Sequence, residues 1–321
     1  MERREFLKTS FGVGFGLSTG ALSLSPKSIV QKQKPGKILT KRTLGKTGKK
    51  LSMVGLGGVV MDKMEPAVAR ELTAEVMDLG LNYFDVAPSY GNAEIVMGEA
   101  IKGRRDSIFL ACKTLERDKE GVLKELHRSL ERLHTDYFDL YQFHALSSME
   151  DVEKIFGPNG AAEAFVKARK EGKVRYIGFS AHSVKAALAA MDRFDFDTVL
   201  FPINFVLFFE ENFGPQVIAK AKEKEMGILA IKALALSLIP EGQKRPFEKC
   251  WYVPVSDREK ADKALRFTLS QPITAAVPPG NPELFRMAVD LALNFRPITE
   301  GEKKELQEYA QGKDPIFKLD L

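Results

Sequence analysis

Residues 108–144 read IFLACK-TLERDKEGVLKELHRSLERLHTDY-FDLYQFH, and this stretch holds one complete unit of the fold. Two short apolar runs, Ile108–Lys113 and Phe138–His144, have the composition of strands that are buried on both faces. Between them, leucines recur at the three- and four-residue spacing of a buried helix face: Leu123, Leu126, Leu130 and Leu133. The order of strand, helix and strand predicts two parallel strands joined by a crossover helix.

The same alternation continues through the chain from Lys41 onward. Helical spacing returns at Val217, Ile218 and Ala221, and six further apolar runs match the first two: Met53–Gly57, Tyr83–Ala87, Val174–Ser180, Thr198–Asn204, Gly227–Lys232 and Ile273–Pro278. Eight such units predict an α/β fold, a (β/α)8 TIM barrel. An open doubly wound sheet is the alternative, but the GxGxxG turn of such sheets is missing after the first run, where residues 55–58 read GLGG.

Two connections differ from the rest. Residues 42–52 carry the glycine-bearing turn of a short hairpin, so we expect an N-terminal β-hairpin that caps the bottom of the barrel. The connection after the seventh run, from Ala235 to about Ser256, is long, and long ordered loops are usually functional. Such a loop lies at the carboxyl end of a barrel, where active sites form. Its aromatic residues are therefore candidate substrate contacts: Phe247, Trp251 and Tyr252.

The first 36 residues have the features of an export signal. The paired Arg3 and Arg4, the following Phe-Leu-Lys and a weakly apolar stretch to Leu24 resemble a twin-arginine leader. The four glycines and several hydroxyl groups of that stretch make it a poor membrane span. We expect a leader over residues 1–36, a single barrel domain over residues 37–321, and export to the periplasm by the twin-arginine machinery. No clear cleavage site stands out, and a disordered basic tail is the alternative.

Composition narrows the classes of partner. Residues 1–36 hold six basic and two acidic residues, so they account for +4 of the net charge of +5. A barrel domain so close to neutrality gives no general attraction to nucleic acid or to anionic lipid. The two cysteines and four histidines have no metal-ligand spacing, so we expect no metal ion and no iron–sulfur cluster.

Four polar residues stand at or just beyond the ends of consecutive predicted strands: Asp85, Tyr90, Lys113 and His144. Neighbouring parallel strands place their ends close together, so these side chains can meet in one pocket. Singly, each has a structural explanation, such as an ion pair between Asp85 and Lys113 or a turn position for Tyr90. All four at the same end of successive strands point instead to an active site.

This set of residues suits the reduction of a carbonyl. A tyrosine can give the proton, although its ordinary pKa of about 10 makes it a slow donor and acceptor at neutral pH. An ammonium beside it favours the phenolate, a role for Lys113 that Asp85 would support. His144 would donate a hydrogen bond to the carbonyl oxygen.

The sequence resembles the aldo-keto reductase family over about residues 40–295. The resemblance rests on DVAPSYG at 85–91, Lys113, DLYQFH at 139–144 and RYIGFS at 175–180. It implies an NAD(P)H-dependent oxidoreductase that interconverts a carbonyl and an alcohol on a small-molecule substrate, with Tyr90 as general acid/base. NADP(H) is the expected cofactor, with NAD(H) as the second choice.

The expected cofactor contacts follow the family pattern only in part. Ala181 stands where the family usually has an asparagine, Ile231 replaces a stacking tyrosine, and Leu284 aligns with an arginine. We assign the cofactor to Ser180, Asn204, Lys232, Pro278, Gly280, Asn281 and Arg286. Within this set Lys232 would contact the pyrophosphate, and a solvated loop lysine is the alternative.

Two other functional classes remain open. The incomplete nicotinamide contacts are compatible with a nucleotide-sensing or partner-binding barrel subunit that has little catalytic activity. A metal-dependent hydrolase on the same fold lacks a ligand cluster in the sequence. Activity with aldehydes and ketones would separate the reductase from the sensing subunit.

Overall fold

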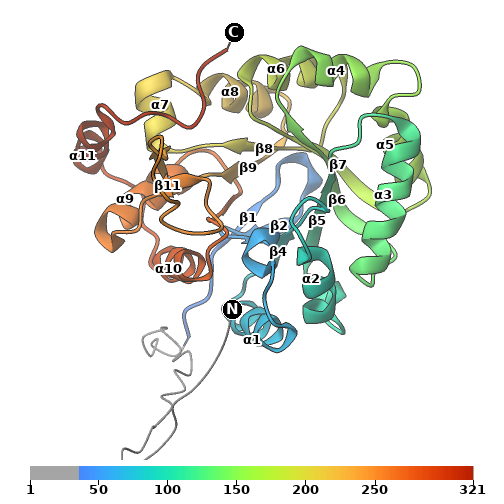
Figure 1. Ribbon diagram of the computed structural model, residues 1–321, viewed down its shortest axis with the longest axis horizontal. Coiled ribbons are helices and arrows are strands. Elements are labelled where there is room, and N and C mark those ends of the chain that lie inside the picture. Colours follow the sequence, from blue (N-terminus) through green and yellow to red (C-terminus); the bar gives the residue numbers. More distant parts are fainter. Residues whose placement is uncertain (1–35, 321) are drawn as a thin grey trace, which may run out of the picture. The chain divides into compact units, whose positions relative to one another are not determined.

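A computed structural model of the protein describes residues 36–320. All eight predicted strands are present, each parallel to its neighbours in the sheet. A bridge between Val54 and Ala276 joins the first strand segment to the last, which confirms the (β/α)8 barrel (Figure 1). The strands are β3 (Leu56–Gly57), β4 (Tyr83–Asp85), β5 (Phe109–Thr114), β6 (Phe138–Leu146), β7 (Val174–Ala181), β8 (Thr198–Pro202), β9 (Gly227–Ile231) and β12 (Ala275–Val277).

Helices surround the barrel (Figure 1). Their apolar side chains pack with those of the strands in one core. In α3, Val122, Leu126 and Leu130 are buried, and the side chain of Asp118 caps the first turn. The helices are α1 (Pro66–Asp78), α2 (Ala93–Ile101), α3 (Lys119–Arg132), α4 (Met149–Phe156), α5 (Ala161–Lys170), α6 (Val184–Arg193), α7 (Phe205–Glu211), α8 (Pro215–Glu223), α9 (Arg258–Leu269), α10 (Pro282–Leu293) and α11 (Glu300–Ala310), with 3-10 turns η1 (Gly45–Thr47), η2 (Gly58–Met61) and η3 (Arg105–Ser107).

The expected hairpin closes the amino-terminal end of the barrel. Strands β1 (Lys41–Thr43) and β2 (Lys50–Ser52) pair in antiparallel fashion, and Leu44 and Leu51 pack on side chains of the barrel interior. The turn between them needs glycine at Gly45, since φ is 45° and a Cβ there would lie 2.3 Å from the backbone of Gly227.

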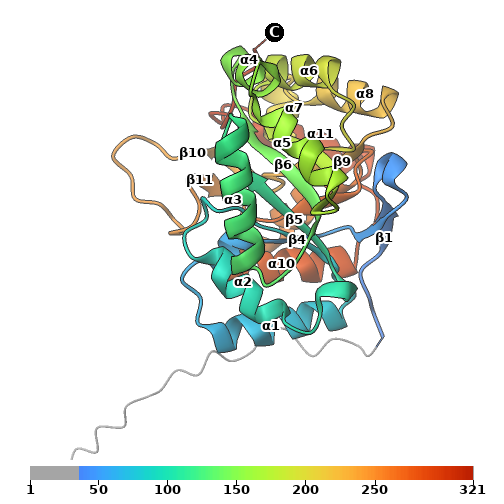
Figure 2. The ribbon, with the colours of Figure 1, turned by 90° about the vertical axis from the view of Figure 1, so that its right-hand side faces the viewer.

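The long connection after β9 lies at the opposite end of the barrel from the hairpin (Figure 2). It contains two short antiparallel strands, β10 (Ala235–Leu238) and β11 (Tyr252–Pro254), which the sequence did not predict. Lys249 ties the connection down, because its Nζ donates to the backbone oxygens of Val60 at 3.0 Å and Asp62 at 2.6 Å. The loop is therefore held over the carboxyl ends of the strands.

The segment after α11 reaches the loop between β7 and α6. The carboxylate of Asp320 accepts the hydroxyl of Ser183 at 2.5 Å and the backbone N–H of Val184 at 2.8 Å. Phe317 stacks on the ring of His182, with the two ring centroids 4.7 Å apart. The C-terminal segment thus adds an aromatic side chain to the carboxyl end of the barrel.

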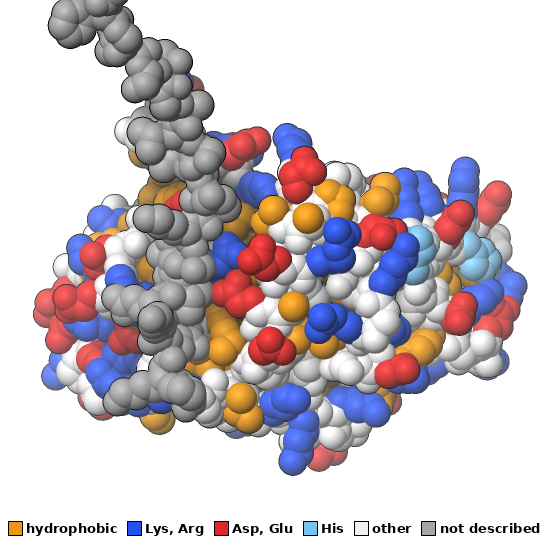
Figure 3. Space-filling model, turned by 90° about the horizontal axis from the view of Figure 1, so that it is seen from below, with side chains coloured by type: hydrophobic (Ala, Val, Ile, Leu, Met, Phe, Trp, Pro, Cys, Tyr) orange, Lys and Arg blue, Asp and Glu red, His pale blue; other side chains and the backbone are white. Residues whose placement is uncertain are grey.

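The predicted leader, residues 1–36, lies outside the described residues except for Gly36. Within residues 36–320 no helix is long and apolar enough to cross a membrane. On the face shown in Figure 3, lysine and arginine side chains are interspersed with aspartate and glutamate side chains. This mixture agrees with the near-neutral charge of the barrel domain.

Candidate active site

The four residues predicted from the strand ends do meet in one place. Asp85 and Lys113 form an ion pair inside the barrel, where both side chains are almost fully buried. The Nζ of Lys113 also donates to the backbone oxygen of Val86 at 3.3 Å. Asp85 and Lys113 can meet beside the end of β6 because β4, β5 and β6 are neighbouring strands of the sheet.

Tyr90 and His144 lie next to this pair. The hydroxyl of Tyr90 is 3.4 Å from Nε2 of His144, and the two rings meet edge to face. The ammonium of Lys113 is 5.0 Å from the centroid of the Tyr90 ring. A phenol, an imidazole and a buried cation are therefore grouped within reach of one small ligand.

Burial and charge set the protonation states of these groups. Burial raises the pKa of Tyr90, and the opposing effect of the Lys113 ammonium does not cancel it. Burial is the largest single effect on the pKa of Lys113 and lowers it, but the charges of Asp85 and Tyr90 and the hydrogen bond to Asp85 together outweigh burial and leave that pKa raised. The pKa of His144 is well below its usual value, first through burial and then through Lys113. At neutral pH the site thus holds a phenol, an ammonium and a neutral imidazole.

The raised pKa of Tyr90 differs from the sequence-based expectation, which considered the cation but not the burial of the phenol. The raised pKa makes Tyr90 a weaker acid, but it also keeps the phenol protonated at neutral pH, so a proton is present to be donated. Nδ1 of His144 is buried and has no hydrogen-bond partner among the described residues. A hydrogen on Nδ1 would have no acceptor, so this environment favours the tautomer with its hydrogen on Nε2. That hydrogen and the Tyr90 hydroxyl could then both be donated to the carbonyl oxygen of a substrate.

The backbone after His144 is fixed from two sides. Arg117 donates to the backbone oxygen of His144 at 2.7 Å, and Asp151 holds that guanidinium at 2.8 Å. Ala145 has a left-handed φ of 56°, and its N–H donates to the hydroxyl of Ser180 at 2.8 Å. Ser180, predicted as a cofactor contact, therefore also holds the irregular end of β6 that carries His144.

The other predicted cofactor residues lie around the same end of the barrel. Asn204 is buried and caps α7, and it also donates to the backbone oxygen of Lys232 at 3.1 Å. Pro278 and Gly280 follow β12, and Asn281 caps α10 by accepting two backbone N–H groups. Arg286, further along α10, forms an ion pair with Glu75 at 3.4 Å, so a nucleotide phosphate would have to compete for it.

Lys232 is held by aromatic rings of the long connection. Its backbone is left-handed, with φ of 64°, and its ammonium lies 5.0 Å and 4.9 Å from the ring centroids of Trp251 and Tyr252. Within the part of the chain that the structure describes, no carboxylate forms an ion pair with it. Burial lowers its pKa to about 8. This cation has lost water without gaining an anionic partner, so an anionic ligand would be favourable there.

The predicted substrate residues differ in their exposure. Trp251 is 39% exposed, Phe247 is half-buried, and Tyr252 is buried in β11. Trp251 also meets the edge of Phe317 from the C-terminal segment. Phe317 and His182 were not recognised as site residues from the sequence. His182 lies two residues beyond Ser180. The position of His182 beyond a strand end was the one signal that could have marked it.

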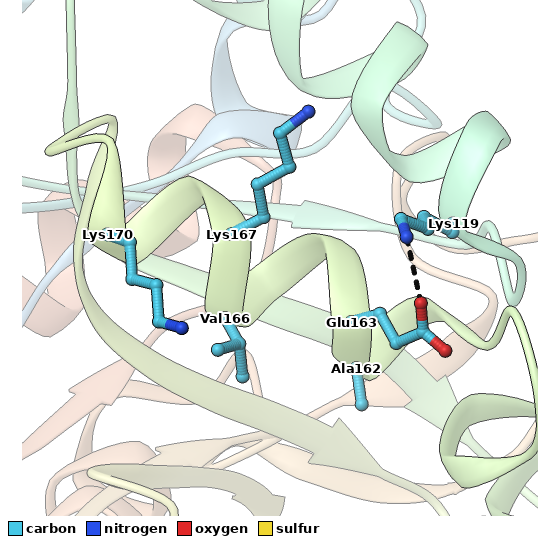
Figure 4. A pocket seen from close by; sticks show the side chains of 6 residues that line it. All are labelled: Lys119, Ala162, Glu163, Val166, Lys167 and Lys170. Carbon is cyan, nitrogen blue, oxygen red and sulfur yellow. Dashed lines mark hydrogen bonds and ion pairs between the residues drawn. The ribbon is translucent and has the colours of Figure 1, made fainter.

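Two surface depressions in the described part of the chain lack this combination of a phenol, an imidazole and a buried ion pair. One lies between α3 and α5, where Lys119 pairs with Glu163 at 2.9 Å (Figure 4), and its lining is Lys119, Ala162, Glu163, Val166, Lys167 and Lys170. A second is beside His127 and His134 near the end of α3. No group of three or more metal-ligating side chains occurs among residues 36–320.

The Aldo/keto reductase family model matches residues 53–309. The chain is 27% identical to the uncharacterized oxidoreductase YqkF of Bacillus subtilis, over 87% of this chain and 99% of that protein. It is 28% identical to L-galactose dehydrogenase of Arabidopsis thaliana, over 70% and 73% of the two chains. The holo form of aldo-keto reductase AKR11C1 from Bacillus halodurans superposes with a TM-score of 0.68 at 25% identity, over 87% and 98%. The chain therefore belongs to the aldo/keto reductase family of NAD(P)H-dependent oxidoreductases, which interconvert carbonyl and alcohol groups.

Proposed function

We propose that Tyr90 is the general acid/base of this oxidoreductase and that His144 orients the carbonyl. The observation that carries the proposal is the 3.4 Å approach of the Tyr90 hydroxyl to Nε2 of His144 beside the Asp85–Lys113 pair. A carbonyl oxygen placed between the two groups would accept a hydrogen bond from each.

When bound, the nicotinamide cofactor would supply the hydride to the carbonyl carbon. As the carbon–oxygen double bond opens, Tyr90 gives its proton to the oxygen and becomes a phenolate. The ammonium of Lys113 stabilises that phenolate, and Asp85 keeps the ammonium in place. His144 stays neutral throughout and donates to the developing alkoxide. In the direction of alcohol oxidation, the phenolate takes the proton back.

The described residues fit a dinucleotide at the carboxyl end of the barrel. We propose that Lys232 contacts the pyrophosphate, because its ammonium has an aromatic cage and no carboxylate partner in the described part of the chain. The segment of Pro278, Gly280 and Asn281 leads into the amino terminus of α10, which also favours phosphate. Ser180 and Asn204 would face the nicotinamide, and Arg286 would favour NADP(H) over NAD(H) by a modest margin.

We further propose a ring-bearing substrate. Trp251, Phe317 and His182 come from three separate segments and stand together at the mouth of the barrel. Flat aromatic side chains beside a polar imidazole suit a ring that carries polar groups. The relative named L-galactose dehydrogenase makes sugars a sensible part of any substrate panel.

The direct test is turnover by the purified protein. Oxidation of NADPH and NADH is followed with a panel of aldehydes and ketones, and reduction of NADP⁺ and NAD⁺ with alcohols and sugars. We expect turnover with members of the panel. The nucleotide-sensing alternative, which Ala181 and Ile231 favour, predicts tight nucleotide binding without turnover on any of them.

Export to the periplasm is a separate proposal. It rests on the paired Arg3 and Arg4 and on the weakly apolar stretch that follows them. The twin-arginine route transports folded proteins, so the cofactor would be bound before export. A nucleotide-dependent enzyme could in this way reach a compartment without free nucleotide.

A further inference from the structure

The two oxygens of Asp85 have different partners. Oδ1 faces the ammonium of Lys113, whereas Oδ2 accepts the side-chain N–H of Gln142 at 3.1 Å and the hydroxyl of Tyr83 at 3.2 Å. Tyr83 and Gln142 are fully buried inside the barrel, on β4 and β6. Neither has a part in the proton transfer described above, yet both touch the carboxylate on which it depends.

The ion pair lies between two tyrosines that have different charged neighbours. Tyr83 contacts the carboxylate, and its pKa is raised well above the usual value, first by burial and then by the charge of Asp85. Tyr90 faces the ammonium, and Lys113 opposes the rise that burial causes in its pKa. When two titratable groups have surroundings that give them different pKa values, the difference helps to distinguish the reactive group from the supporting one. Tyr83 therefore remains a phenol that donates to Asp85.

We infer that Tyr83 and Gln142 are positioning residues of the proton relay, which hold Asp85 so that Lys113 stays directed at Tyr90. A carboxylate can only accept hydrogen bonds, and each donor offsets part of its negative charge. Without these donors more of that charge would act on Tyr90 and make it a weaker acid. The inference rests on the proposed role of Tyr90, and it assigns a function to two residues outside the set of four.

The test uses Tyr83→Phe and Gln142→Met, which each remove one donor and keep nearly the same volume. Tyr176→Phe is the matched control, because its hydroxyl donates to the backbone of Thr47 at 3.4 Å, at the hairpin end of the barrel. Tyrosine labelled with ¹³C at Cζ allows the ionisation of Tyr90 to be followed by NMR in the free protein. Its resonance is the one that disappears in Tyr90→Phe.

We expect the titration of Tyr90 to move upward by about 0.3–1 pH unit in both variants, the effect of losing one hydrogen bond to a nearby charge. The control should titrate like the wild type. With an active substrate, the alkaline limb of the kcat profile should move in the same direction, and the nucleotide Kd should stay within about twofold.

An unchanged Tyr90 titration in either folded variant would overturn the inference, even if turnover fell, because packing alone would then explain the loss. If one variant does not fold, the other decides. The titration needs neither nucleotide nor substrate. A failure of the proposed function would therefore appear differently, as absent turnover in a wild-type protein whose variants still shift the Tyr90 titration.

Discussion

The Tyr90 hydroxyl stands 3.4 Å from Nε2 of His144, and the two side chains come from different parts of the barrel. Tyr90 lies in the turn after β4, while His144 is on β6. Their burial keeps the pKa of the phenol high and the pKa of the imidazole low. Both groups are therefore in the uncharged form at neutral pH, and both can donate to the same oxygen.

Lys113→Met should lower kcat by about 10²-fold or more, because the phenolate formed by Tyr90 loses its cation. Without the ammonium the pKa of Tyr90 rises further, so the alkaline limb of the reduction profile should move to higher pH. The substitution also leaves Asp85 buried without its partner, at a cost of about 3–5 kcal/mol in stability. The thermal midpoint is therefore measured beside the pH profile.

The double variant Asp85→Asn with Lys113→Met provides the control for stability, since it removes both charges. It should regain part of the lost stability without regaining kcat. If Lys113→Met alone kept a normal pH profile and a normal kcat, Lys113 would be a purely structural partner of Asp85.

Lys232→Ala should weaken the binding of both nucleotides by about ten- to hundredfold, the effect of losing one charge-assisted hydrogen bond. The pKa of Lys232 is about 8 in the free protein, and a bound pyrophosphate would raise it. In the wild type, Kd should therefore be constant below pH 8 and increase as the pH rises above it. Fluorescence of Trp251, the one tryptophan of the chain, reports the binding.

Lys244→Ala serves as the control, because Lys244 is an exposed lysine of the same loop. It should bind both nucleotides as the wild type does, with the same pH dependence. Equal Kd values for Lys232→Ala and the wild type would assign the phosphates to the backbone around Pro278–Asn281 instead.

Arg286→Ala should reduce the preference for NADPH over NADH and leave the affinity for NADH unchanged. Arg286 pairs with Glu75 at 3.4 Å, so binding to a 2′-phosphate would exchange one acidic partner for another. The preference should for this reason be modest in the wild type. An unchanged ratio of the two Kd values would remove Arg286 from the nucleotide site.

Replacing Arg3 and Arg4 with lysine should keep the protein in the cytoplasm, because the twin-arginine machinery reads the arginine pair. Cell fractionation followed by immunoblotting measures the distribution. A protein with the reverse change, Lys32→Arg and Lys34→Arg, is the control for altered basic residues in the leader. Export of the double lysine variant at the normal level would disprove the twin-arginine proposal.

The barrel and the four central residues were predictable for a local reason. Strands that are buried on both faces read as apolar runs, and a polar side chain such as Lys113 at the end of such a run is conspicuous. Neighbouring strands bring their ends together whatever the details of the loops. Hence Asp85, Lys113 and His144 could be placed in one site before any contact was known.

Features that depend on distant contacts were not predictable. Strand β6 continues beyond His144 because Ser180, on another strand, holds the left-handed Ala145. The pKa of Tyr90 depends on burial by the folded chain, which the neighbouring Lys113 alone does not reveal. The contact between His182 and Phe317 joins two segments far apart in the sequence. None of these leaves a periodic signal in the residues themselves.

The most direct test of the account is the hydride-transfer rate of Tyr90→Phe, measured in a single turnover with saturating NADPH and a carbonyl that the wild type reduces. The ring is kept and only the proposed proton donor is lost. The rate should fall by about 10²-fold or more while the nucleotide Kd stays near the wild-type value. A rate within about threefold of the wild type would contradict the account, because general acid catalysis is typically worth far more than that.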